Sequence, residues 1–421
     1  MTIRYCDCAI AVPRKCGIPA RLIVFVMVSS AATAVAQEST DFGAAVTSGK
    51  AAVNLRYRYE QVDEDSIAET ANASTARLRL NYRTGQWRNW SAFAEFDHLF
   101  HIVLTDFNSG AGTSPNKTQY PVVADPKGPD LNQLYLDYAA TPDWKVRVGR
   151  QRILLDNQRF VGGVGWRQNE QTYDGVSVTT TALRNTHVFY SYINTVRRIF
   201  GERVPAGRNE TDTHLLNAKV ELNDNWSLTP YLYYIDNDDV PEFSTSTIGA
   251  RIEGGFETDA GKIALVGEFA TQADAGNAPV NYDAQYAHID AGWTMSNGLT
   301  LGLGFESLGG GSNPGEAFRT PLATLHAFQG WADKFLTTPA GGIDDIYATG
   351  KYGFGKWNLT AVYHDFSAET GSGDYGTELD VSIGRSFMKN YGVLFKAAFF
   401  NSDSVAFTDT NKFWIMLTAS Y

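Results

Sequence analysis

The chain has 421 residues, including 39 glycines and 21 tyrosines, and its formal net charge is −11 at pH 7. A phosphate-binding surface needs a basic excess, so this charge excludes nucleic acid as the expected partner. The only cysteines are Cys6, Cys8 and Cys16. A chain processed beyond them contains neither a disulfide nor a thiolate metal site.

The N-terminus has the features of a secretory signal peptide. Arg14 and Lys15 belong to a basic start, residues 22–28 form a short apolar core, and 34–36 give an A-x-A cleavage pattern. The apolar core is too short to cross a bilayer as a helix. We therefore predict that residues 1–36 are a cleaved signal peptide and that the protein leaves the cytoplasm.

Beyond a short lead-in at 37–49, apolar and polar residues alternate to the end of the chain. In the first segment Val53 and Leu55 alternate with Asn54 and Arg56. This period of two predicts strands with one apolar and one polar face. About eighteen segments have the ~9–11 residues of a tilted transmembrane strand. They lie near 50–61, 73–84, 89–101, 130–140, 144–153, 172–182, 185–196, 212–222, 226–236, 246–257, 261–272, 283–295, 299–308, 344–354, 356–367, 375–388, 391–401 and 410–421.

The connections between these segments alternate between short and long. Tight turns such as those at 141–143 and 223–225 are followed by longer connections, the longest at 102–129, 154–171 and 309–343. Tryptophans lie beside the short turns, as in an interfacial girdle. Short periplasmic turns and long extracellular loops indicate an all-β, antiparallel outer-membrane barrel of a Gram-negative bacterium. A soluble propeller is the alternative, but the chain has no repeated blade unit. We predict one barrel domain over 50–421.

A barrel of this size leaves an aqueous lumen, so the inward polar face bears on function. Basic residues concentrate in the first two strands and the fifth, which predicts a basic wall, whereas most acids come later. The alternative is that these residues pair with each other across neighbouring strands. The predicted inward basic residues are Arg56, Arg58, Arg77, Arg79, Arg83, Lys145, Arg147, Lys219, Arg251, Lys262 and Lys396; the acidic ones are Glu60, Glu95, Asp97, Asp137, Glu221, Glu253, Glu268, Asp290, Glu306, Glu378 and Asp380.

The segment 149–176 is dense in arginine, amide side chains and glycine. Strand parity makes it the third long connection, at the extracellular mouth of the lumen. Arginine binds carboxylates in a bidentate manner, so the segment favours binding and guidance of oxygen-rich solutes. An ordinary polar loop is the alternative interpretation.

Two stretches resemble a known family. The sequence RVGRQRILLDNQRFVGGVGWRQNEQTYDGV, at 147–176, looks like the hallmark segment of the alginate-export family of outer-membrane proteins. LHAFQGWADKF, at 325–335, looks like a second segment that recurs in that family. The resemblance implies an eighteen-stranded barrel that passes an anionic uronate polysaccharide passively. The positions it carries over are Arg147, Arg150, Arg152, Arg159, Arg167 and Asp174.

The connection 309–343 has apolar residues at helical spacing: Leu322, Leu325, Phe328, Trp331 and Phe335. The spacing predicts a short amphipathic helix. If the loop folds inward it narrows the pore, with Phe328, Trp331 and Phe335 at the constriction and Trp331 able to stack on a sugar. The alternative is a rim loop that packs on a neighbour. Connection 102–129 is expected to be a second lid or disordered.

Signatures of catalysis are lacking: there is no G-x-S-x-G elbow and no H-E-x-x-H motif. We expect no enzymatic activity, metal or cofactor. The predicted function is a passive outer-membrane channel for anionic saccharides such as alginate and uronates, or for related carboxylates; the alternative is a general diffusion porin. Expected partners are membrane lipid, the barrel-assembly machinery and the solute, without a required oligomer. The predicted pore-lining residues are Arg56, Arg58, Arg77, Arg79, Arg147, Arg150, Arg152, Arg159, Arg167 and Asp174.

Overall fold

The computed structural model describes residues 38–39 and 41–421. The predicted signal peptide at 1–36 lies outside these residues. Before the barrel begins, the chain forms the short helix α1 (Phe42–Thr47), whose first turn is capped by the Asp41 carboxylate. No helix among the described residues is long and apolar enough to cross a membrane.

The strands form one closed antiparallel barrel, as predicted. In the described part of the chain the sheet has 20 strands; β1 (Glu38–Ser39) and β4 (Gln86–Trp87) have two residues each, and the other eighteen run round the barrel in chain order. These are β2 (Lys50–Glu64), β3 (Ala71–Arg83), β5 (Trp90–Asp106), β6 (Gly128–Thr141), β7 (Trp144–Gln151), β8 (Thr172–Thr180), β9 (Thr186–Arg197), β10 (Arg208–Asn223), β11 (Trp226–Asn237), β12 (Thr245–Thr258), β13 (Gly261–Asp274), β14 (Asp283–Met295), β15 (Thr300–Leu308), β16 (Ile343–Phe354), β17 (Trp357–Ser367), β18 (Asp374–Phe387), β19 (Tyr391–Ser402) and β20 (Thr410–Ser420).

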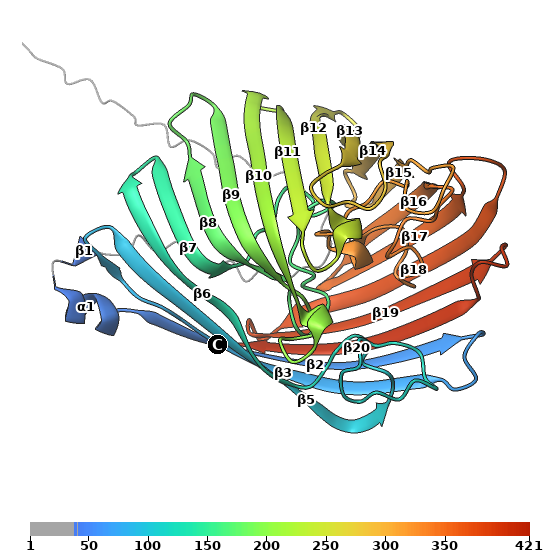
Figure 1. The fold of residues 1–421 in the computed structure, drawn as a ribbon, viewed down its shortest axis with the longest axis horizontal. Helices are drawn as coiled ribbons and strands as arrows, with labels where there is room; N and C mark the ends of the chain where they lie inside the picture. Colours follow the sequence, from blue (N-terminus) through green and yellow to red (C-terminus); the bar gives the residue numbers. More distant parts are fainter. Residues whose placement is uncertain (1–37, 40) are drawn as a thin grey trace, which may run out of the picture. The chain divides into compact units, whose positions relative to one another are not determined.

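The barrel closes where the first long strand meets the last. β2 and β20 are antiparallel, with Leu55 opposite Ala419. Beyond β20, the amide of Val53 donates to the carbonyl of Tyr421 at 2.8 Å, and the amide of Tyr421 donates back at 2.9 Å. Figure 1 shows this seam as the blue β2 beside the red β20. Within residues 41–421 the wall therefore has no open edge strand, as a membrane requires.

The apolar face of the strands points outward. Leu303 and Ile289 are 68% and 64% exposed, and similar residues recur on nearly every strand. Such a large apolar surface is unfavourable in water but suits a hydrocarbon environment. The alternation read from the sequence therefore sets the two faces of the wall.

Short and long connections lie at opposite ends of the barrel. The turns at 142–143, 224–225, 259–260 and 355–356 have two residues each. Helix α1 lies at this end, where the amide of Gly85 donates to the carbonyl of Ala45 at 2.8 Å. We call this the short-turn end and the opposite one the loop end.

Two long connections fold into the barrel. We name residues 152–171, between β7 and β8, inner loop A, and residues 309–342, between β15 and β16, inner loop B. Phe160 of loop A and Phe318 of loop B share one buried apolar cluster with Tyr286 of the wall. The lumen is thus partly filled by its own loops. The connection before β6 is also packed, because Phe107 and Val123 are buried.

The amphipathic helix expected in loop B is not formed. Its described chain contains one 3-10 turn, η3 (Leu325–Ala327). Gln329 and Asp333 have φ values of +54° and +61°, which interrupt a right-handed helix. The prediction was wrong because the backbone here bonds to the barrel wall, as described below, rather than to itself.

Candidate pore and its arginine network

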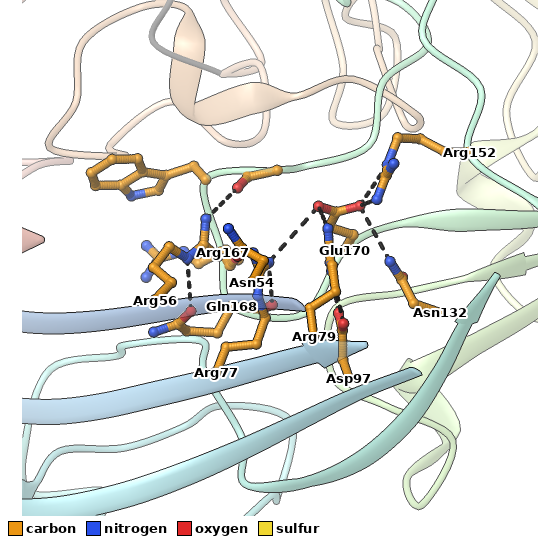
Figure 2. A network of polar contacts seen from close by, with 12 residues as sticks. Asn54, Arg56, Arg77, Arg79, Asp97, Asn132, Arg152, Arg167, Gln168 and Glu170 are labelled. Carbon is orange, nitrogen blue, oxygen red and sulfur yellow. Dashed lines mark hydrogen bonds and ion pairs between the residues drawn. The ribbon is translucent and has the colours of Figure 1, made fainter. Parts of the chain in front are cut away.

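The arginines of β2 and β3 hold inner loop A against the wall. Arg56 and Arg77 lie opposite each other on the inward face. Arg56 Nε donates to Gln168 Oε1 at 2.8 Å, and Arg77 Nη1 donates to the Gln168 carbonyl at 3.1 Å (Figure 2). Arg56 Nη1 also reaches the carbonyl of Gly165 at 2.9 Å. Both guanidinium groups are buried, so they anchor the loop rather than line an open passage.

Glu170 is the central carboxylate of this network. Figure 2 shows it between Arg79, whose Nη1 lies 2.8 Å from Oε1, and Arg152, whose Nε lies 2.6 Å from Oε2. Arg79 also pairs in bidentate fashion with Asp97, directly opposite on β5, at 2.7 and 2.6 Å. Burial alone would raise the pKa of Glu170, but Arg152 and Arg79 lower it well below its ordinary value. The carboxylate is therefore held ionised between two cations.

Arg167 connects the wall to both inner loops. It belongs to loop A, and its Nη1 contacts the Glu60 carboxylate of β2 at 3.1 and 3.2 Å. Its Nη2 contacts Asp333 of loop B at 3.1 Å. Beside it, Arg58 is fully buried and ion-paired with Asp125 of the β5–β6 connection. Three connections thus converge on the inward face of β2.

The two inner loops also bind each other through their backbones. The amide of Gly162 donates to the carbonyl of Leu322 at 2.8 Å, and the amide of Thr324 donates to the carbonyl of Gln158 at 3.0 Å. The two stretches that carry the family resemblance are also in contact, because Arg167 binds Asp333 and Trp166 stacks on His326, although they are far apart in sequence. The sequence contains no periodic signal for such a contact.

Arg159 fixes loop A to the far side of the lumen. Its Nε donates to Glu306 Oε1 of β15 at 2.7 Å, and its Nη1 donates to Thr320 of loop B at 3.2 Å. Its guanidinium carbon lies 4.9 Å from the ring centre of Phe328. Arg159 is almost completely buried.

The predicted constriction residues occupy different environments. Lys396 Nζ lies 3.6 Å from the ring centre of Trp331 and thus covers one face of that ring. Phe335 is buried against Phe366 of the wall, with ring centres 4.6 Å apart. Phe328 and Trp331 remain half-buried. Of the three predicted constriction residues, only these two keep a partly exposed surface.

The backbone after η3 is bound by two wall carboxylates. The amide of Trp331 donates to Asp380 Oδ2 at 3.0 Å, and the amide of Ala332 donates to Glu378 Oε1 at 2.7 Å. Gly330 has a φ of +82°, and a Cβ there would lie 2.2 Å from the Glu378 carboxylate. Only glycine fits this close approach.

His326 is a neutral link within loop B. Its Nδ1 bonds to Asp333 Oδ1 at 2.7 Å, and its Nε2 bonds to Lys396 Nζ at 2.7 Å. Because Lys396 donates, Nε2 must accept, which leaves the ring proton on Nδ1. Burial, with a contribution from Lys396, lowers the pKa of His326 to about 3. His326 also stacks on Trp166 of loop A, with ring centres 4.7 Å apart.

Arg150 and Asp174, both carried over from the resemblance, lie side by side on β7 and β8. Arg150 Nε donates to Asp174 Oδ1 at 2.8 Å, and Arg197 of β9 shares the same carboxylate at 2.6 Å. These groups are partly exposed near the loop end. Among residues 41–421, no hydrogen bond or ion pair joins Arg150 or Asp174 to Glu170.

A second basic cluster lies at the short-turn end. Asp137 of β6 accepts from Arg147 Nε at 2.6 Å, and it contacts Lys145 Nζ at 2.9 Å and Arg83 Nη1 at 3.4 Å. Arg83 and Lys145 were predicted to face inward but were not among the predicted pore-lining residues. The signal that could have found them is the placement of three cations and one acid beside two short turns.

On the opposite wall, cross-strand pairing accounts for the charges. Arg251 of β12 lies directly opposite Glu268 of β13, and Arg251 Nη1 donates to Glu268 Oε2 at 2.7 Å. Lys219 Nζ contacts Glu253 Oε1 at 3.1 Å. The alternative interpretation, pairing across neighbouring strands, is confirmed for Arg251 and Glu268, whereas Lys219 and Glu253 are paired across the intervening β11. Among residues 41–421, no three His, Cys, Asp or Glu side chains are grouped to hold a metal ion.

A closed eighteen-stranded barrel with an apolar exterior and inward-folded loops is an outer-membrane channel. The family model for alginate export matches residues 49–288, more than half of the chain, and the chain belongs to this family. It is therefore a Gram-negative outer-membrane protein and a passive channel rather than an enzyme. None of the curated proteins is a significant match to the sequence.

Solved structures share the fold at low sequence identity. OccAB2 of Acinetobacter baumannii is 16% identical with a TM-score of 0.71, over 90% of this chain and 99% of that one. OccAB4 of the same organism is 13% identical with a TM-score of 0.70, over 89% and 98%. OpdK of Pseudomonas aeruginosa with vanillate is 13% identical with a TM-score of 0.68, over 89% and 99%. These likenesses establish the architecture.

Proposed function

We propose that the channel passes small anionic solutes, namely carboxylated saccharides such as uronates or related carboxylates. The observation that carries this proposal is the relative exposure of paired charges on the wall formed by β3, β6, β7 and loop A. The Arg147 side chain is 21% exposed above Asp137 at 5%, and that of Arg152 is 27% exposed above Glu170 at 8%. The cation is thus the partner nearer to the lumen in both pairs.

This geometry favours anions although the pairs are electrically balanced. A solute in the lumen approaches the exposed guanidinium more closely than the carboxylate beneath it, so the attraction exceeds the repulsion. Free N–H groups of a guanidinium match a carboxylate in bidentate geometry. Small solutes fit the proposal better than a thick polymer, because two loops already occupy the lumen. OpdK, a channel of the same fold, was crystallised with vanillate, which is a carboxylate.

The predicted arginines divide into two roles in this proposal. Arg147, Arg150 and Arg152 are partly exposed and contact the solute. The buried ones position the inner loops and so set the width of the passage; they are Arg56, Arg58, Arg77, Arg79, Arg159 and Arg167. Phe328 and Trp331 remain the aromatic candidates at the constriction.

A general diffusion porin is the second candidate. It is favoured by the opposite wall, where the Lys219 side chain is 29% exposed and its partner Glu253 is 39% exposed. There the carboxylate is the more accessible charge. A lumen with one basic and one acidic wall would have little net preference if solutes contact both walls equally.

Planar-bilayer recordings separate the two candidates. The reversal potential in a KCl gradient gives the anion preference, and galacturonate added to either side tests current block. We expect the double variant Arg147→Ala with Arg152→Ala to lower both the anion preference and the block by galacturonate. Lys219→Ala, the matched control on the opposite wall, should leave galacturonate block intact. If the double variant keeps the wild-type reversal potential and block, the channel is a general porin.

A further inference from the structure

The basic cluster at the short-turn end differs from the rest of the network in its charge. Among the residues that the structure describes, Asp137 is the only carboxylate paired with it, and three cations share that carboxylate: Arg83, Lys145 and Arg147. Three positive charges against one negative leave a surplus of two. The nearest inward acid along this wall, Glu95, is already paired with other arginines. The surplus is therefore not neutralised within the wall.

The two arginines of this cluster are held in place by aromatic rings. The Arg147 guanidinium carbon lies 3.8 Å from the ring centre of Tyr135, and that of Arg83 lies 4.8 Å from the ring centre of Phe93. The two rings are themselves stacked, with centres 5.2 Å apart. Arg83 Nη2 also donates to the Tyr135 hydroxyl at 2.6 Å. Side chains fixed in this way lose little conformational entropy when they bind a ligand.

The cluster keeps free hydrogen-bond donors and is open to solvent. A guanidinium has five N–H groups and an ammonium has three, and most of those on Arg83 and Lys145 are not used by Asp137. Their side chains are 42% and 44% exposed, whereas Asp137 is 5% exposed. All of these residues lie on inward positions of β3, β5, β6 and β7, next to the short turns. A solute that traverses the lumen meets them at this end.

We propose that Arg83, Lys145 and Arg147 form an anion-binding subsite that takes a carboxylate group of the solute at the short-turn end of the lumen. This inference rests on the proposed function and adds to it a defined binding site within the lumen. Asp137 is the internal counter-ion that orients the three cations. The solute carboxylate adds a second negative charge to that of Asp137, so the three cations bind it. The next solute molecule then replaces it.

The test is current block by citrate, a tricarboxylate, added to one side of an oriented channel. The orientation is determined with Val405→Cys and a membrane-impermeant thiol reagent that labels it. Val405 is an exposed position in the β19–β20 connection at the loop end. For the wild type we expect block from the short-turn side at a short electrical distance. Arg83→Gln with Lys145→Gln should raise the apparent Kd of that block by about tenfold or more, as expected for lost charge-assisted hydrogen bonds.

Lys219→Gln is the matched control, because Lys219 is also an inward lysine near a short turn but has a more exposed partner. It should leave the block unchanged. The single variant Arg83→Gln serves if the double variant does not fold, as judged by heat-modifiable migration on gels. If wild-type citrate block is absent or survives both substitutions while anion selectivity persists, the subsite is wrong and the proposed function stands. If the wild type has no anion preference, the proposed function fails first.

Discussion

Arg79 and Arg83 lie four residues apart on the same face of β3, yet their surroundings differ. Arg79 is bound by Asp97 and Glu170 and its side chain is 9% exposed. Arg83 shares Asp137 with two other cations and is 42% exposed. A guanidinium with its own carboxylates becomes part of the packed wall, whereas one that shares a carboxylate remains available to a ligand. The ratio of acidic to basic side chains around each arginine, and not the strand that carries it, decides its role.

The largest expected effect comes from removing the buried member of this comparison. Arg79→Ala leaves Asp97 buried without its cation and Glu170 with one arginine fewer, and breaking such buried pairs costs about 3–5 kcal/mol. We expect a lower midpoint of thermal unfolding on heat-modifiable gels and a changed single-channel conductance, since loop A loses its support. Arg184→Ala, at an exposed turn position, is the control. An unfolding midpoint equal to that of the wild type would contradict the role of Arg79 in holding loop A against the wall.

Arg167→Ala should weaken the attachment of the two inner loops to each other and to β2. It leaves Glu60 and Asp333 with fewer partners, and the expected result is larger open-channel noise with faster proteolysis in residues 152–171. Arg167→Lys keeps the charge but loses the fork that reaches both acids, so it should restore only part of the wild-type behaviour. Full restoration by lysine would show that charge alone suffices.

Acidification should loosen loop B through His326. Its pKa is about 3 in the folded protein, below its ordinary value of 6.5, because it is buried beside Lys396. Between these two values the undocked loop takes up a proton that the docked loop excludes, so docking is strongest above about pH 6.5 and weakens toward pH 3. Asp333, whose pKa is lowered by His326, Lys412 and Arg167 despite its burial, acts in the same direction at lower pH.

The measurement for this prediction is open-channel noise from pH 7.5 to 4. His326→Gln keeps hydrogen-bonding groups without a titratable ring, and it should flatten the rise of noise with acidity. An unchanged pH profile in that variant would assign the response to other groups.

The smallest effect on stability is expected at the exposed member of the comparison. Arg83→Ala removes a partly solvated ion pair, which contributes about 0–1 kcal/mol. The unfolding midpoint and conductance should stay near wild type, while the anion preference falls. A large loss of stability would place Arg83 with Arg79 as a structural residue.

The barrel could be predicted from the sequence because each strand separates apolar from polar residues with a period of two. The main differences are at strand ends: β5 continues to Asp106 and β10 begins at Arg208, beyond the predicted bounds of 101 and 212. The alternation disappears in both extensions: residues 208–211 are all polar, whereas residues 102–104 are three consecutive apolar residues. The hydrogen-bonded strand continues although its sequence signal has ended.

The site was less predictable. Arginines on β2 and β3 were expected to line an open lumen, but their partners, Gln168 and Glu170, arrive from a loop without periodicity about 90 or more residues away. The helical spacing of Leu325, Phe328 and Trp331 was misleading, because wall carboxylates took the backbone amides that a helix would have used. Contacts of this kind depend on which way a loop folds, and a local pattern does not encode that.

The seam between β2 and β20 has a consequence for assembly. These strands are separated by nearly the whole chain: Asn54 Nδ2 donates to Ser420 Oγ across 366 positions. Until β20 pairs with it, β2 exposes unpaired N–H and C=O groups that hydrocarbon cannot satisfy. A chain truncated before β20 would therefore form an open sheet with two unpaired edge strands rather than a smaller channel. We expect membrane insertion and the pairing of β20 with β2 to occur as one cooperative event.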